Sequence, residues 1–492
     1  MNEDGQDQPD GNRWRQLDKD LKRIGRLELG GQAISRPLAA PGAALAFILL
    51  ACGAAALALS PTGSGWALVL ATGVGAYMAL NIGANDVANN VGPAVGARVL
   101  TMGGALLIAA VFESLGAVLA GGDVVATISG GIVAPGDFET PEGFVRAMIC
   151  AMIAAAAWVN LSTWLGAPVS TTHAIVGGVL GAGLAGGGLW AVNWPAMGAI
   201  AAGWVASPLM GGAVAAGLLA FLQSRIARAP DPLEAGRRWT PALVGAMTGV
   251  FTAYLALKAL SHLVPVRPWQ ALATGALVGL ACWATLRPLV ARASAGMEAR
   301  PRSLKVLFRL PLAIAAALLS FAHGANDVAN VVGPLAAIAL AAEHVEPGAL
   351  LVAPAWVMAI GALGISLGLL LFGPRLVRMV GDEITKLSPP RAWCVAMSAA
   401  TTVTLASSLG LPVSSTHVAV GGVFGVGFLR EWQEARRARR SRAPDHAPEE
   451  RSRRMLVRRS HFLTILAAWV VTAPVAGLLS ALLLSLTNLL LP

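Results

Sequence analysis

The chain contains few charged residues for its length, and this shortage excludes an ordinary soluble enzyme. Of its 492 residues, 13 % are charged and 56 % are hydrophobic, whereas soluble domains carry roughly 25 % charged residues. The four cysteines lie far apart within apolar runs and form no CxxC pair, so they give no sign of redox chemistry. The sequence also lacks HExxH and Walker patterns, which argues against an enzyme of those classes and against ATP-driven transport by this chain.

The positive charges that are present follow a topological pattern. The formal net charge is +10, but almost no aromatic residues stand among the arginines, so nucleic acid is not the expected partner. Basic loops mark the cytoplasmic side of membrane proteins. With residues 1–38 in the cytoplasm, every basic loop falls on that side: 226–239, 290–306, 373–390 and 430–460. The acidic segments 123–143 and 341–348 fall outside. We therefore expect a multi-pass protein of the cell inner membrane with a cytoplasmic N-terminus, in contact with the lipid bilayer.

Apolar segments of about 20 residues can cross a bilayer as helices, and the chain has many of them. Four stretches exceed one span and contain glycine, proline or a polar cluster, so a break, a strong tilt or two crossings are expected in each: 66–98, 195–225, 307–340 and 462–490. Two further regions, 145–187 and 391–429, are interrupted by Pro168 and Pro412. Each of these two regions is predicted to form two half-length helices that meet at a polar turn, which is a re-entrant hairpin.

Two polar strings occur twice. The aspartate motif occupies 83–89 and returns almost unchanged at 324–330, and the hydroxyl motif occupies 168–173 and returns at 412–417. The second copies follow in the same order at nearly the same spacing, which indicates a long internal repeat. Combined with the charge pattern, it predicts an all-α polytopic membrane protein with inverted-topology repeats, two re-entrant helical hairpins and broken helices.

The predicted organisation has five parts. They are a cytoplasmic arm at 1–38, an additional transmembrane helix at 39–65, repeat 1 at 66–226, linking helices and loops at 227–306, and repeat 2 at 307–490. Repeat 1 contains the hairpin 145–187, and repeat 2 contains the hairpin 391–429 and the basic cytoplasmic loop 430–460.

The aspartate motif predicts a cation site. Gly83 and Gly324 are expected to interrupt their helices and free backbone carbonyls. The motif also supplies hard oxygen ligands, which sodium ions and protons prefer: Asn85, Asp86 and Asn89, with Asn326, Asp327 and Asn330 in the second copy. If sodium is the ion, Asp86 and Asp327 are its metal ligands. The structural alternative is a polar cluster in which amides and carboxylates satisfy one another.

The hydroxyl motif predicts an anion site, because each run begins a glycine-rich half-helix and helix N-termini bind anions. The expected substrate-binding hydroxyls are Ser170, Thr171, Thr172, Ser414, Ser415 and Thr416. Ordinary capping of the two helices is the alternative. His173 and His417 follow the runs and are expected to be neutral, supporting rings.

Two further buried ionisable residues lie outside the duplicated strings. Glu113 is in the middle of an apolar segment and is either a cation or proton ligand or a structural partner of a hydroxyl. His323 directly precedes the second aspartate motif, but Ile82 stands at the equivalent position of the first. His323 is therefore expected to have a secondary role.

The duplicated motifs, together with the segment 112–116 around Glu113, resemble the inorganic phosphate transporter family (PiT) over about residues 66–490. The short loop 290–306 is similar to that of its bacterial branch. The resemblance implies phosphate symport with sodium or protons by a homodimer, with no further cofactor. It assigns cations to Asp86 and Asp327 with Asn85 and Asn326, and phosphate to the hydroxyl runs. Some members carry a second glutamate before the second run, whereas 392–411 contain no acid here.

The residues alone leave several functions open. A sulfate permease of the same fold fits equally well, since sulfate is also a tetrahedral oxyanion. A passive anion channel would not need paired aspartates, and an intramembrane enzyme acting on lipid phosphates would need a nucleophile and base that the sequence lacks. The coupling ion and the form of the substrate, free phosphate or a metal–phosphate complex, also stay open.

Overall fold

In a computed structural model the chain is built from α-helices. The structure describes residues 38–57, 65–165, 169–260, 264–298, 300–342, 353–383, 387–441 and 459–490. Within these ranges there is one isolated β-bridge, between Val133 and Val192, and no strand. Ten of the described helices are long and apolar enough to cross a membrane. Residues 1–37 of the predicted arm and most of the predicted loop 430–460 lie outside the described residues, although the loop's first part continues a helix to Ser441.

The first repeat follows a helix at Leu38–Leu57. Its helices are α2 (Gly65–Gly96), α3 (Met102–Ala120), α4 (Gly122–Gly130), α5 (Pro141–Trp164), α6 (Thr171–Gly186) and α7 (Trp194–Leu222). Two long linking helices, α8 (Pro232–Lys258) and α9 (Pro268–Ala293), pack against each other and lead to the short α10 (Pro301–Leu307). The second repeat comprises α11 (Arg309–Asp327), α12 (Ala329–Ala342), α13 (Ala355–Glu383), α14 (Pro389–Ser408), α15 (Ser415–Ser441) and α17 (Arg459–Leu490).

The two repeats are inverted and exchange their packing partners. Helix α2 packs against α13 and α11 against α3, while α17 covers α6 and α7 covers α15. Arg309, at the start of α11, donates to the carbonyl of Arg98, just past the end of α2 (3.3 Å). Because the two motif helices pass through the same core and one begins where the other ends, they run in opposite directions.

Glycines allow these crossings to be close. A Cβ on Gly83 of α2 would lie 1.9 Å from the carbonyl oxygen of Ile365 on α13, and one on Gly324 of α11 would lie 2.1 Å from that of Glu113 on α3. Such separations exclude any larger side chain without movement of the helix backbones. The motif glycines therefore serve close packing between the repeats.

The structure corrects several predicted breaks. Helix α2 runs continuously from Gly65 to Gly96, through the first aspartate motif, so the predicted interruption at Gly83 is wrong. Helices α7 and α17 are also continuous although each contains a proline, so of the alternatives expected for 195–225 and 462–490 a break is excluded and a tilt is compatible. In the second motif α11 ends at Asp327 and α12 begins at Ala329, leaving a break of one residue. The predicted half-length arms before the two hydroxyl runs are wrong too, because α5 has 24 residues and α14 has 20.

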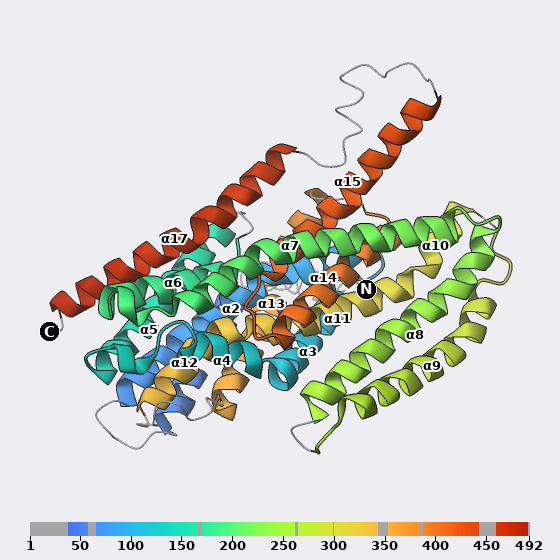
Figure 1. Ribbon diagram of the computed structural model, residues 1–492. Helices are drawn as coiled ribbons and strands as arrows, with labels where there is room; N and C mark the ends of the chain where they lie inside the picture. Colours follow the sequence, from blue (N-terminus) through green and yellow to red (C-terminus); the bar gives the residue numbers. More distant parts are fainter. Residues whose placement is uncertain are drawn as a thin grey trace, which may run out of the picture.

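One end of the molecule gathers the basic segments. In Figure 1, α10 and the far end of α15 lie at the upper right, whereas α12 lies at the lower left. Arg237 at the start of α8 donates to the carbonyl of Ser294 just past α9 (2.6 Å), and α10 contacts both α8 and α14. The predicted basic loops between α7 and α8 and between α9 and α11 therefore lie at the same end, here called the basic end.

Candidate functional site

The carboxylate of Asp86 lies where the two hairpins meet. It is fully buried. Thr171 of the first hairpin donates to its Oδ2 (3.0 Å), and Thr416 of the second donates to its Oδ1 (3.1 Å). Asn85 donates to the same Oδ1 (3.0 Å). One carboxylate thus joins the helix N-termini of both repeats, although they are more than 200 residues apart in the chain.

The second repeat reproduces part of this pattern. Asp327 accepts from Ser415 (3.3 Å), as Asp86 accepts from Thr171. Asn89 donates to Thr416 of the second hairpin (2.8 Å), and Asn330 donates to Thr172 of the first (3.2 Å). Each repeat therefore contributes an aspartate to its own hairpin and an asparagine to the opposite one.

The first asparagine of each motif holds the backbone of its own hairpin. Asn85 donates to the carbonyl of Val169 (3.2 Å). Asn326 donates to the carbonyl of Leu411 (3.2 Å), and its own side-chain oxygen accepts from the amide of Val413 (3.3 Å). Side-chain bonds to otherwise free backbone groups are what a non-helical turn needs inside a membrane protein.

The first hydroxyl of each run caps its helix. Ser170 accepts from the amide of His173 (3.1 Å), and Ser414 accepts from that of His417 (3.3 Å). The predicted phosphate role is thus geometrically better served by Thr171, Thr172, Ser415 and Thr416, which face the motif side chains. The histidine rings stack face to face on tryptophans, His173 on Trp204 (centroids 3.8 Å apart) and His417 on Trp469 (3.7 Å).

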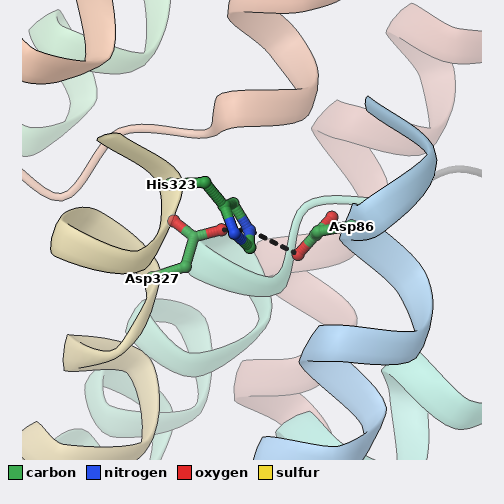
Figure 2. A group of neighbouring side chains, drawn as sticks. All are labelled: Asp86, His323 and Asp327. Atoms are coloured by element: carbon green, nitrogen blue, oxygen red, sulfur yellow. Dashed lines mark ion pairs between the residues drawn. The ribbon is translucent and has the colours of Figure 1, made fainter. Parts of the chain in front are cut away.

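His323 lies at the centre of the site, whereas its lack of a counterpart in the first motif predicts only a secondary role. Its Nε2 is 2.8 Å from Asp327 and 3.7 Å from Asp86, and its Nδ1 is 3.3 Å from Glu113. Figure 2 shows its imidazole between the two carboxylates. Glu113 in turn accepts from Asn90 (2.7 Å). The signal was available: an ionisable residue inside an apolar segment marks a functional site by default.

This polar group is not duplicated. The internal repeat aligns His323 with Ile82, Asn90 with Val331 and, through a shared Ser-Leu-Gly string, Glu113 with Ile365. The three apolar counterparts belong to one buried hydrophobic cluster. Ser114 and Ser366, which follow Glu113 and Ile365, contact each other at 2.6 Å, so the two environments adjoin.

Four buried side-chain oxygens of the central site have no hydrogen-bond donor among the described residues. They are Oδ1 of Asp327, Oε2 of Glu113, and the side-chain oxygens of Asn90 and Asn330. Buried acceptors without donors are costly, and buried charges need a partner or an ion. Asp86, Asp327 and His323 also place ligand atoms within 4.8 Å of one another. Three carboxylates beside one imidazole make the group suited to cations.

A membrane protein made of inverted halves, with ionisable residues and the tips of two hairpins at its centre, is a secondary transporter by architecture. Residues 82–480 match the phosphate transporter family. The chain is 42 % identical to a Helicobacter pylori protein named "Putative phosphate permease", over 87 % of this chain and 81 % of that protein. It is 32 % identical to "Inorganic phosphate transporter 2-1, chloroplastic" of Arabidopsis thaliana, over 82 % and 70 % of the two chains.

A solved structure titled "The sodium-dependent phosphate transporter" is also similar, with a TM-score of 0.77, 32 % identity and coverage of 86 % of this chain and all of that one. The chain therefore belongs to the phosphate transporter family and is a multi-pass membrane protein that transports phosphate. The resemblance stated from the motifs is confirmed, and so is the all-α polytopic fold.

Proposed function

We propose that this protein imports inorganic phosphate across the cell inner membrane by symport with cations, with sodium as the coupling ion. The observation that carries the proposal is Asp86, which accepts hydroxyl hydrogen bonds from the N-terminal turns of both hairpin helices, Thr171 and Thr416. An anion site and a cation site thus share the same side chains. A sodium-dependent relative with 32 % identity supports the choice of ion.

The charges of the site give the order of binding. Asp86, Asp327 and Glu113 are all buried, so the empty site repels a phosphate anion. Cations bound by the aspartates neutralise it, and the hydroxyls of Thr171, Ser415 and Thr416 then turn toward phosphate, assisted by the two helix N-termini. Phosphate therefore binds well only after the cations, and this order couples phosphate transport to cation transport.

Uptake of labelled phosphate into proteoliposomes tests this proposal. Sodium, proton and divalent-cation gradients are imposed one at a time, with excess sulfate as competitor. We expect a sodium gradient to drive concentrative uptake and sulfate to compete poorly. Uptake driven by a proton gradient alone would assign protons instead, a requirement for divalent cations would indicate a metal–phosphate substrate, and equilibration without any gradient would refute symport.

The remaining finer proposals concern assembly and orientation. We propose a homodimer, which the mass of the detergent-solubilised protein tests. We also propose that the basic end lies in the cytoplasm, because basic loops stay on that side during insertion. Protease access to the arm 1–38 in vesicles of known orientation tests the second proposal.

A further inference from the structure

A cavity of about 840 Å³ lies beside the central site, between the helix at Leu38–Leu57 and α2, α5 and α13. Asn81, Asn160 and Thr163 line its polar part, and Arg375 and Arg378 of α13 also line it. None of the described residues that line it is acidic. Cavities of roughly 300–1,000 Å³ hold drug-sized ligands, so this one has room for phosphate together with water.

The cavity extends toward the basic end. Helices α2 and α13 run side by side in the same direction, since Gly368 meets Leu80 and Gly373 meets Val87. Arg375 and Arg378 follow Gly373 and therefore lie beyond the level of Asp86, toward the end of α2. That end of α2 is the one at which Arg309 contacts the backbone of Arg98.

A short series of hydrogen bonds leads from the cavity wall to the central carboxylate. Asn160 of α5 donates to Asn81 of α2 (2.8 Å), and Thr163 of α5 donates to Asn85 (3.2 Å). Asn85 in turn donates to Asp86 (3.0 Å). The described polar groups of this series belong to α5 and α2.

On the opposite side the equivalent region is joined to neighbouring helices by an ion pair and hydrogen bonds. Lys258 of α8 forms an ion pair with Asp123 of α4 and donates to the carbonyl of Ser408, at the end of α14 (3.5 Å). Thr127 of α4 donates to the carbonyl of Gly410 (2.7 Å). The bonds from Lys258 and Thr127 connect the turn of the second hairpin to helices outside it, whereas the cavity lies on the side of the basic end.

We propose that this cavity is the vestibule through which phosphate leaves the central site toward the cytoplasm, and that Arg375 and Arg378 draw the anion outward. The inference rests on the proposed function. Both arginines are exposed, and guanidinium groups match the geometry of phosphate oxygens. Basic groups in a low-dielectric cleft raise the local concentration of anions, while exposed ion pairs are weak enough to let phosphate go.

Face-specific kinetics tests the role of the arginines. The full-length double variant Arg375→Gln/Arg378→Gln is assayed in right-side-out and in inside-out vesicles, with Arg292→Gln as a control that removes an exposed charge near the end of α9. We expect the half-saturating phosphate concentration to rise about threefold to tenfold at the cytoplasmic face only, and less at high salt. An equal rise at both faces, or none at the cytoplasmic face, would overturn the proposal.

Thiol labelling tests the location of the cavity. In a variant whose four native cysteines are alanine, Asn160→Cys is treated with a membrane-impermeant thiol reagent. We expect labelling from the cytoplasmic face only, slowed by phosphate, and no labelling of Leu161→Cys, which is exposed but does not line the cavity. Labelling of Asn160→Cys from the outer face, or from neither, would contradict the vestibule. Wild-type vesicles that take up no phosphate would refute the proposed function itself.

Discussion

Replacing Asp86 by asparagine is the sharpest test of the central site. The change keeps the shape of the side chain but removes its charge and turns one oxygen into a donor, opposite the hydroxyl of Thr171 or Thr416. Removing one partner of a buried charge pair costs about 2–5 kcal/mol, and 1.4 kcal/mol is a factor of ten in affinity. The half-saturating cation concentration should therefore rise at least about 30-fold. Asp327→Asn should behave alike, because Asp327 accepts from Ser415 in the same way.

The assay is sodium-driven uptake of labelled phosphate into proteoliposomes, measured over a wide range of sodium concentrations. The amount and elution profile of purified variant protein report whether it still folds. Asp231→Asn is the matched control, because Asp231 caps α8 at an exposed position and asparagine caps as well as aspartate. An unchanged sodium dependence in both central variants would refute the cation role of the aspartates.

Two further predictions concern His323 and the crossing glycines. His323→Gln should reduce uptake about tenfold or more, because the carboxylates of Asp86 and Asp327, between which the imidazole lies, then face each other. Ser320→Ala is the control, because Ser320 lies one turn earlier and is equally buried, and this variant should leave uptake intact. Equal losses of uptake in both variants would contradict this reasoning. Gly116→Ala should destabilise the purified protein by about 1–3 kcal/mol, seen as a lower melting temperature, because its Cβ would lie 2.0 Å from a backbone oxygen of α11. Gly103 lies in the same helix, and a Cβ added there would have no neighbouring atom within 4 Å, so Gly103→Ala should not lower the melting temperature. A stable Gly116→Ala variant would show that the crossing tolerates a side chain.

Much of this architecture could be predicted because the chain contains two copies of the same motifs. The duplicated strings revealed the repeat, and the arginine-rich loops indicated that the halves are inverted. The structure then brings residues of both copies together as the repeat implies, with Asn89 on Thr416 and Asn330 on Thr172. Periodicity and charge are local properties of the chain, so they can be read without knowing which helices touch.

What the sequence could not give depends on contacts between the repeats. Glycine is a residue type that favours helix breaks, but Gly83 lies inside α2. Glycine is required there because a carbonyl oxygen of α13 is too close to leave room for a Cβ. The first motif has Ile82 where the second has His323, so the repeat gives no indication that this histidine is central to the site. Its partners Asp86 and Glu113 come from α2 and α3, and only the packing of α11 against both helices brings the three together.

The unduplicated residues bear directly on coupling. If both halves carried the same side chains, the two aspartates would bind cations in equivalent surroundings. Instead the Asp327 side adds Glu113, His323 and Asn90, where the other side has an apolar cluster. Asp86 already accepts from four side-chain donors, whereas Oδ1 of Asp327 has none among the described residues. Because buried charge without a donor is the costlier state, the first cation should bind on the Asp327 side. Binding at Asp86 then requires Thr171 and Thr416 to release the carboxylate, and their freed hydroxyls are those that we propose to bind phosphate.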